Sequence, residues 1–221
     1  MGKKRTFAGA VDWPGWCLSG RDENSALQAL FDYGDRYARA IQPARLGFRA
    51  PGDLSAFKVV ERLEGNSTTD FGAPAVAPSS DARPVGGDEL QRFQALLEAL
   101  WQAFDEAVRS AAGKELRKGP RGGGRELERI VRHVLEADTG YLNQLGWKLK
   151  KPAEETGLEG ELEHARQNIL AALPAAARGE LPAVGPRGGL RWPPRYYVRR
   201  SAWHVLDHAW EIEDRVEQSD E

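Results

Sequence analysis

The amino-acid sequence predicts an α+β protein that is mostly α-helical, with a four-helix bundle that follows a small β-α-β unit. Residues 88–218 contain four long segments whose apolar side chains recur every three or four residues, as in amphipathic helices. Residues 1–65 instead contain short β-prone segments separated by Pro and Gly. We therefore expect a bundle domain at 88–218, a small N-terminal unit at 1–65, and a linker or long loop at 66–87.

The N-terminal unit is expected from two β-prone segments on either side of one helix. Residues 6–11 (TFAGAV) and 57–63 (FKVVERL) are predicted strands, and residues 12–15 (DWPG) are a predicted turn. The intervening helix is indicated by apolar residues at helical spacing: Ala26, Leu27, Leu30, Tyr33, Tyr37 and Ile41. Residues 65–87, which follow, are rich in Gly, Pro, Ser and Thr and bury little apolar surface.

The first two bundle helices are predicted from apolar stripes and boundary signals. Asp88 as N-cap with Gln91 three residues later forms a capping-box pattern at the start of the first helix. Its stripe contains Leu90, Phe93, Leu97, Leu100, Phe104 and Ala107. The second helix is expected at about 124–150, after the Gly- and Pro-rich residues 118–123, with a stripe of Leu127, Ile130, Val134, Tyr141 and Leu145.

The last two bundle helices are also predicted from boundary signals and apolar spacing. The third is expected to begin at Thr156, with Glu159 completing a second capping box, and to end at Pro174. The fourth is expected to begin just before Tyr196, because two prolines precede it. Its stripe has alternating spacings of four and three: Val198, Ala202, Val205, Ala209, Ile212 and Val216. Four such helices predict a four-helix bundle.

Composition and charge exclude several classes of protein. With 31 basic and 33 acidic residues the net charge is −2, which argues against a nucleic-acid partner, despite a short basic start at residues 3–5. The sequence has no apolar run long enough for a membrane span and no apolar secretory signal, so we expect a cytoplasmic protein without a membrane partner. Cys17 is the only cysteine, which excludes an internal disulfide and a thiolate zinc site. Any metal must therefore bind to His and carboxylates.

Three of the four histidines are placed for metal binding. His204 and His208 are four residues apart on the predicted last helix, so their rings leave one face about one turn apart. His133 lies near the middle of the second bundle helix and can face the last helix. We predict a metal site made by these three residues. Three neutral imidazoles suit Zn, Ni, Fe or Cu and leave a coordination position open for water or substrate.

The alternative interpretation is that these histidines have no ligand role. Two histidines at i and i+4 are a weak signal alone, and they more often face solvent or are satisfied in the core. Their flank of the helix also carries polar residues: Tyr197, Ser201, Glu211 and Arg215. The opposite flank is apolar, with Trp203, Leu206 and Trp210, so we expect a mostly buried helix whose histidines line a cleft. His164 lies in a strongly charged segment and is expected at the surface.

Two carboxylates on the second bundle helix need a role. Asp138 falls inside the apolar stripe, so it needs a partner. It either pairs with Arg199 or Arg200 of the last helix, or supports the site as a proton-exchanging or ligand-orienting group. Glu136 is within reach of His133, but its surroundings indicate solvent. No catalytic base is assigned.

These features resemble a known family. One histidine in the second helix, within residues 132–142 (RHVLEADTGYL), and an HxxxH pair in the fourth, within residues 199–211 (RRSAWHVLDHAWE), are similar to the DinB-like superfamily of metal-binding bundle proteins. The match covers about residues 88–218. The resemblance implies a DinB-like four-helix bundle with a divalent metal, Zn, Ni or Fe, held by His133, His204 and His208.

The resemblance also implies a reaction class. Characterised members include thiol-dependent transferases and isomerases, such as the maleylpyruvate isomerase that uses mycothiol. The leading prediction is thus a metal-dependent enzyme that acts on a small-molecule substrate with a low-molecular-weight thiol as second cofactor. Arg199, Arg200 and Arg215 are candidates to hold an acidic substrate or a cofactor carboxylate, with surface solvation as the alternative for at least two of them.

Other functions stay open on the sequence alone. The same bundle fits a non-catalytic, stress-related binding protein in which the metal is structural, or a metal-dependent hydrolase that uses bound water. Imidazole ligands accept several metals, so the native ion is not fixed. The sequence leaves homodimer formation through the bundle or the N-terminal unit open.

The N-terminal unit resembles a second, smaller pattern. Residues 6–41 are similar to the strand-turn-helix arrangement of small HicB-like antitoxin domains, a likeness of architecture only. Cys17 is expected to be a small buried residue, with a thiol near the cleft as the alternative. Trp13 and Trp16 flank a proline turn and are expected either to pack on the bundle or to wall the pocket.

Overall fold

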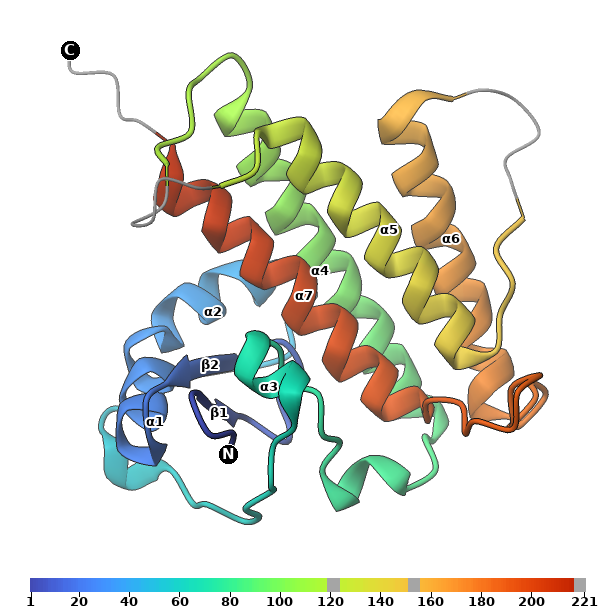
Figure 1. The fold of residues 1–221 in the computed structure, drawn as a ribbon, viewed down its shortest axis with the longest axis horizontal. Helices are drawn as coiled ribbons and strands as arrows, with labels where there is room; N and C mark the ends of the chain where they lie inside the picture. The colour runs from blue at the N-terminus through green and yellow to red at the C-terminus, as the bar shows by residue number, and fades with distance from the viewer. Residues whose placement is uncertain (119–123, 151–155, 217–221) are drawn as a thin grey trace.

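Four long helices form the body of the protein (Figure 1). The structure is a computed structural model that describes residues 1–118, 124–150 and 156–216. The long helices are α4 (Gly87–Ala111), α5 (Leu127–Leu145), α6 (Gly157–Ala177) and α7 (Pro194–Arg215). They pack on one another around an apolar core that includes Leu97, Phe104, Ile130 and Ile169. One small antiparallel sheet accompanies them, which confirms the predicted α+β, mostly α class.

Helix α7 lies at the centre of the packing. One side contacts α4 and α5, and its buried apolar residues there include Val198, Ala202 and Val205. The other side meets the N-terminal unit, where Trp203 packs edge-to-face on Phe7 at 6.1 Å between ring centroids. The helix is thus enclosed on two sides, as its two apolar flanks predicted.

Two predicted helix boundaries next to prolines are wrong. Helix α6 continues through Pro174 to Ala177. Proline cannot donate to the carbonyl of Leu170, but Gln94 Nε2 on α4 donates to that oxygen instead, at 3.2 Å. Helix α7 begins at Pro194, earlier than the expected start just before Tyr196, because proline is well tolerated at the first helical position.

The predicted capping boxes are absent from the described helix starts. Helix α4 is capped by Gly86, not Asp88, and neither this cap nor Thr156 at the start of α6 makes a side-chain capping bond. Helix α5 is shorter than predicted. It ends at Leu145, where Gly146 adopts the left-handed conformation that commonly terminates a helix.

The N-terminal unit is a β-hairpin followed by two helices, not a β-α-β unit. Strand β1 (Thr6–Gly9) pairs antiparallel with β2 (Cys17–Gly20), because the turn between them brings adjacent segments together. The predicted strand at 57–63 is extended chain that pairs with no strand in the described structure. The predicted single helix is divided into α1 (Glu23–Asp32) and α2 (Gly34–Ile41).

The linker predicted at 66–87 contains one short helix beside β1 and a 3-10 turn packed on α7. Helix α3 (Ser67–Phe71) is capped by Asn66, and a 3-10 turn spans Ser79–Ala82. Within that turn Asp81 is fully buried and accepts two hydrogen bonds from Arg199, at 2.7 and 2.9 Å. The same arginine donates to the carbonyls of Ala10 and Val11, so it joins the linker, the hairpin and α7.

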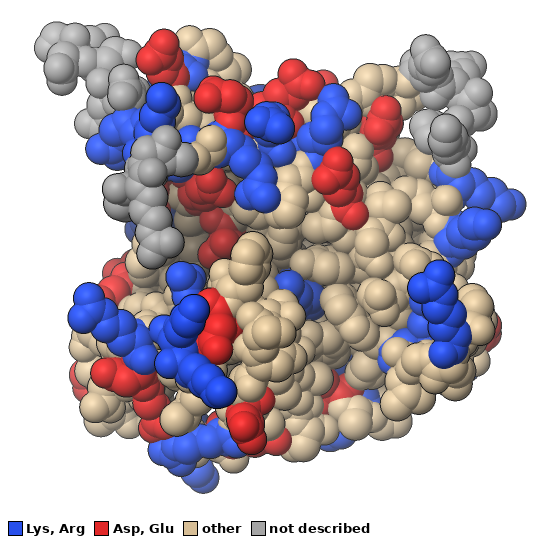
Figure 2. Space-filling model, viewed as in Figure 1, with Lys and Arg blue, Asp and Glu red and all other residues tan. Residues whose placement is uncertain are grey.

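The surface carries charges of both signs. On the face drawn in Figure 2, basic and acidic side chains are interspersed over the described residues. None of the described helices is both long enough and apolar enough to cross a membrane.

Candidate metal centre

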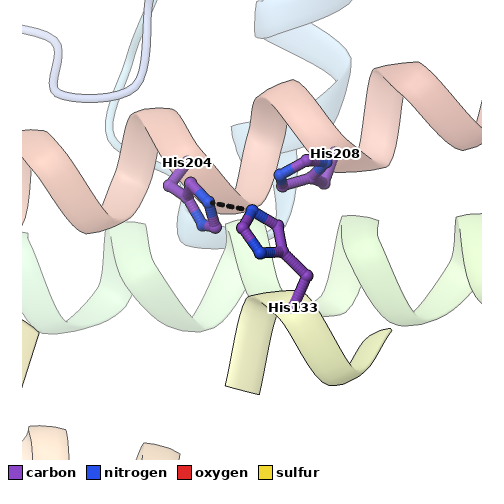
Figure 3. A group of neighbouring side chains, drawn as sticks. All are labelled: His133, His204 and His208. Carbon is purple, nitrogen blue, oxygen red and sulfur yellow. Dashed lines mark hydrogen bonds between the residues drawn. The ribbon is translucent and has the colours of Figure 1, made fainter. Parts of the chain in front are cut away.

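The structure brings the three predicted ligands together between α5 and α7 (Figure 3). His133 extends from α5, and His204 and His208 extend from adjacent turns of α7. One ligand atom from each residue can be chosen so that all three lie within 4.8 Å of one another. His204 and His208 are buried and His133 is half-buried. The fourth histidine, His164 on α6, lies apart and has its Nε2 2.9 Å from the carbonyl oxygen of Lys150.

The spacing of two nitrogens fits a shared ion. His133 Nε2 and His204 Nε2 are 3.3 Å apart. Two imidazole nitrogens bound to one tetrahedral ion at about 2.0–2.1 Å would be separated by about 3.3–3.4 Å. The third ring is close, since the centroid of His208 lies 5.0 Å from that of His133 and 4.6 Å from that of His204.

Both facing rings favour the neutral form that binds metals. Burial, and then the neighbouring His208 and His133, lower the pKa of His204 to about 2. Burial, and then Arg125, also lower the pKa of His133. Nδ1 of His204 is buried and has no hydrogen-bond partner among the described residues. The donor set therefore suits a borderline divalent ion such as Zn, Ni or Fe.

Glu211 orients the third ring. Its Oε2 lies 2.7 Å from Nδ1 of His208, three residues earlier on the same helix, so the opposite nitrogen, Nε2, is left for an ion. Arg215 donates to the other carboxylate oxygen at 2.8 Å and also to the backbone carbonyls of Arg117 and Arg125. Burial raises the pKa of Glu211, but these hydrogen bonds outweigh it and hold the value below the usual range. The sequence analysis did not assign this role to Glu211. The signal that could have indicated it is the spacing of three residues between His208 and Glu211, which places both side chains on one face of the helix.

Aromatic and basic side chains pack beside the histidines. Tyr141 lies edge-to-face on His204 at 5.7 Å between centroids. The guanidinium of Arg200 stacks over Tyr141 at 5.5 Å and over Trp203 at 4.7 Å. Of the three arginines proposed for acidic ligands, Arg199 is bound to Asp81 and Arg215 to Glu211, while Arg200 forms no ion pair within the described chain.

The predicted pairing of Asp138 with Arg199 or Arg200 is wrong. Arg199 is bound to Asp81, Arg200 forms no ion pair with any described residue, and the buried Asp138 has an Oδ2 that contacts no donor in the described part of the protein. Burial raises its pKa to about 7, although Arg166 lowers it. Asp138 thus remains largely protonated below neutral pH. Glu136 is exposed, as expected.

The residues of the N-terminal turn lie on the other side of α7. A cavity of about 470 Å³ is lined by Trp16 and Cys17 but by none of the three histidines. Cys17 is half-buried rather than buried as predicted, and desolvation raises the pKa of its thiol to about 12. Trp16 is buried and donates from Nε1 to the carbonyl of Leu30, while Trp13 packs on Phe48.

Comparison with known proteins adds no relative to this picture. No family model matches the chain, and neither the curated proteins nor the solved structures yield a match. The DinB-like and HicB-like resemblances therefore stay predictions, which rest on the quoted residues alone.

Proposed function

We propose that the chain is a metal-dependent enzyme whose divalent ion is held by His133, His204 and His208, and that it acts as a thiol-dependent transferase or isomerase. The observation that carries the metal site is the 3.3 Å separation of two neutral imidazole nitrogens on different helices. The nitrogen donors favour Zn, Ni or Fe. Three protein ligands leave a position for a thiol, water or substrate.

The reaction class is supported by the DinB-like resemblance and by the surroundings of the histidines. When bound, a divalent ion lowers the pKa of a coordinated thiol or water, so the anion is available near neutral pH. Glu211 would hold the His208 ring in place for the ion. The thiol must come from a cofactor, because the only cysteine, Cys17, has a raised pKa and lies in the separate cavity.

Turnover measurements test this proposal. Protein purified without an affinity tag would be loaded with Zn, Ni or Fe(II) and screened against small electrophiles and cis-dienoic acids, with and without glutathione or mycothiol. We expect thiol-dependent turnover that is lost in His204→Ala and retained in His164→Ala, which removes the histidine outside the site. Equal turnover in both variants would contradict the proposal.

Two other outcomes distinguish the alternatives. Hydrolysis of esters or amides without any thiol, again lost in His204→Ala, would indicate a metal-dependent hydrolase. If no reaction is found and chelation lowers the thermal midpoint of unfolding, the ion is structural, because its binding free energy then contributes to folding. That result would favour the non-catalytic, stress-related binding protein.

A further inference from the structure

The cavity on the far side of α7 has the size and walls of a ligand site. Its volume of about 470 Å³ lies within the range of about 300–1,000 Å³ that is usual for small-molecule pockets. The walls come from β1, α1, the extended segment 57–63 and α7. Most of the surface is apolar, with contributions from Phe7, Trp16, Leu27, Leu30, Phe57 and Trp203.

The segment 57–63 is fixed at its ends but is not paired with β1. Phe57 packs on Trp16 at 5.6 Å between centroids, and the carbonyl of Leu63 accepts a hydrogen bond from the amino group of Met1. Arg62 forms an ion pair with Glu23 of α1 at 2.6 Å. Between these anchors the chain makes no ladder with β1 in the described structure, and both segments line the cavity. These contacts therefore hold segment 57–63 in place, and the space between it and β1 belongs to the cavity.

Two basic side chains of the wall, Arg200 and the exposed Lys58, form no ion pair within the described residues. Arg199 is bound to Asp81 and Arg62 to Glu23, and the carboxylate of Glu61 accepts from the backbone and hydroxyl of Ser79. Arg200 lines the cavity, and its Nη1 is buried without a hydrogen-bond partner among the residues described. A guanidinium without an ion pair keeps N–H donors for a charge-assisted hydrogen bond to an anion.

We propose that this cavity binds a small apolar carboxylate, an aromatic acid or an aliphatic acid of medium chain length, with its carboxylate on Arg200. The apolar walls match the body of such a ligand, and the planar guanidinium suits a carboxylate. Arg200 also stacks on Tyr141, which packs on His204, so the ligand would lie one side chain removed from the metal centre. The proposal does not rest on the proposed function, since no histidine of that centre lines the cavity.

Calorimetric titration with octanoate tests the proposal directly. We expect wild-type protein to bind octanoate and to bind octanol, which has the same chain without the charge, about ten- to a hundredfold more weakly. Arg200→Gln should weaken octanoate binding by a similar factor and leave octanol binding unchanged. The matched control is Lys58→Gln, because Lys58 is an exposed basic residue of the same cavity wall and should matter little.

A second variant tests the location. Leu27→Trp adds bulk at a half-buried wall position and should abolish binding of both probes, while unfolding curves confirm that the variant is folded. The proposal is overturned if octanoate does not bind to the wild type, if octanoate and octanol bind equally, or if Lys58→Gln weakens binding and Arg200→Gln does not. Loss of metal from the protein would leave octanoate binding intact, so failure of the metal site is distinguishable.

Discussion

Helix α7 separates two regions of opposite character: an imidazole cluster against α5 and an apolar cavity against the N-terminal hairpin. In the first, burial lowers the pKa values of His204 and His133, and Glu211 contacts the ring of His208. The second is built from aromatic and aliphatic walls with a single unpaired guanidinium, that of Arg200. The comparison teaches that one helix can carry a polar cluster on one flank and an apolar cavity wall on the other when both flanks are covered.

The largest expected effect on stability comes from breaking the ion pair between Arg199 and Asp81. Arg199→Ala leaves the fully buried carboxylate of Asp81 without its partner and removes two hydrogen bonds to the hairpin carbonyls. We expect the free energy of unfolding to fall by about 3–5 kcal/mol, measured by urea denaturation. Arg132→Ala, which breaks an exposed pair with Glu128, should cost less than about 1 kcal/mol. Equal losses would contradict the structural role of Arg199.

The next prediction concerns Glu211, which orients the ring of His208 in the candidate metal site. Glu211→Gln removes the carboxylate from His208 Nδ1 while keeping a side chain of the same size. We expect metal affinity to fall by about 10- to 100-fold in competition with a chromogenic chelator. Glu136→Gln, an exposed carboxylate three residues from His133, is the control and should have little effect. An unchanged affinity in Glu211→Gln would exclude the orienting role.

Asp138 should make stability depend on pH. Its folded-state pKa of about 7 lies above the ordinary value of 3.8, so between these values the unfolded chain loses a proton that the folded protein keeps. This contribution therefore lowers stability as pH rises from about 4 to 7. Asp138→Asn should flatten the pH dependence, because the buried group then no longer ionises. It should raise the free energy of unfolding at pH 8 by roughly 1 to 2 kcal/mol, since the gain from removing a buried charge is partly offset by an amide that also lacks partners. Parallel pH profiles of the two proteins would contradict this.

The smallest effect is expected at Cys17. With a pKa of about 12, on the order of one thiol in ten thousand is ionised at pH 8, so alkylation by iodoacetamide should be far slower in folded than in unfolded protein. Cys17→Ala should leave thiol-dependent turnover unchanged. Rapid alkylation of the folded protein, or loss of turnover in the variant, would return Cys17 to the candidate reactive groups.

The bundle helices and the histidine cluster could be predicted because their signals are local. The i, i+4 spacing places His204 and His208 on one face, and the apolar stripes fix which faces of α5 and α7 meet. The predicted helix end at Pro174 is wrong because the carbonyl that proline leaves without a donor, that of Leu170, accepts a hydrogen bond from Gln94, a residue 80 positions before Pro174. The segment 57–63 has the composition of a strand, but its pairing depends on where the hairpin and the N-terminal residues place it.

The partners of buried charges were also beyond local reasoning. One of the two roles open for Asp138 was pairing with an arginine of the last helix, but Arg199 is bound to Asp81 from the segment that composition marked as a linker. The cavity depends on the same tertiary contacts, because four separate segments line it. Spacing within one helix is encoded in the sequence directly, whereas competition among distant partners is decided only in the folded chain.

The most direct test of the metal centre is the metal content of protein purified without an affinity tag. Elemental analysis would compare wild type with the double variant His133→Ala, His204→Ala and with the control His164→Ala. We predict close to one divalent ion per chain in the wild type and in the control, and almost none in the double variant. Equal metal in all three proteins, or none in the wild type after reconstitution, would contradict a site made by His133, His204 and His208.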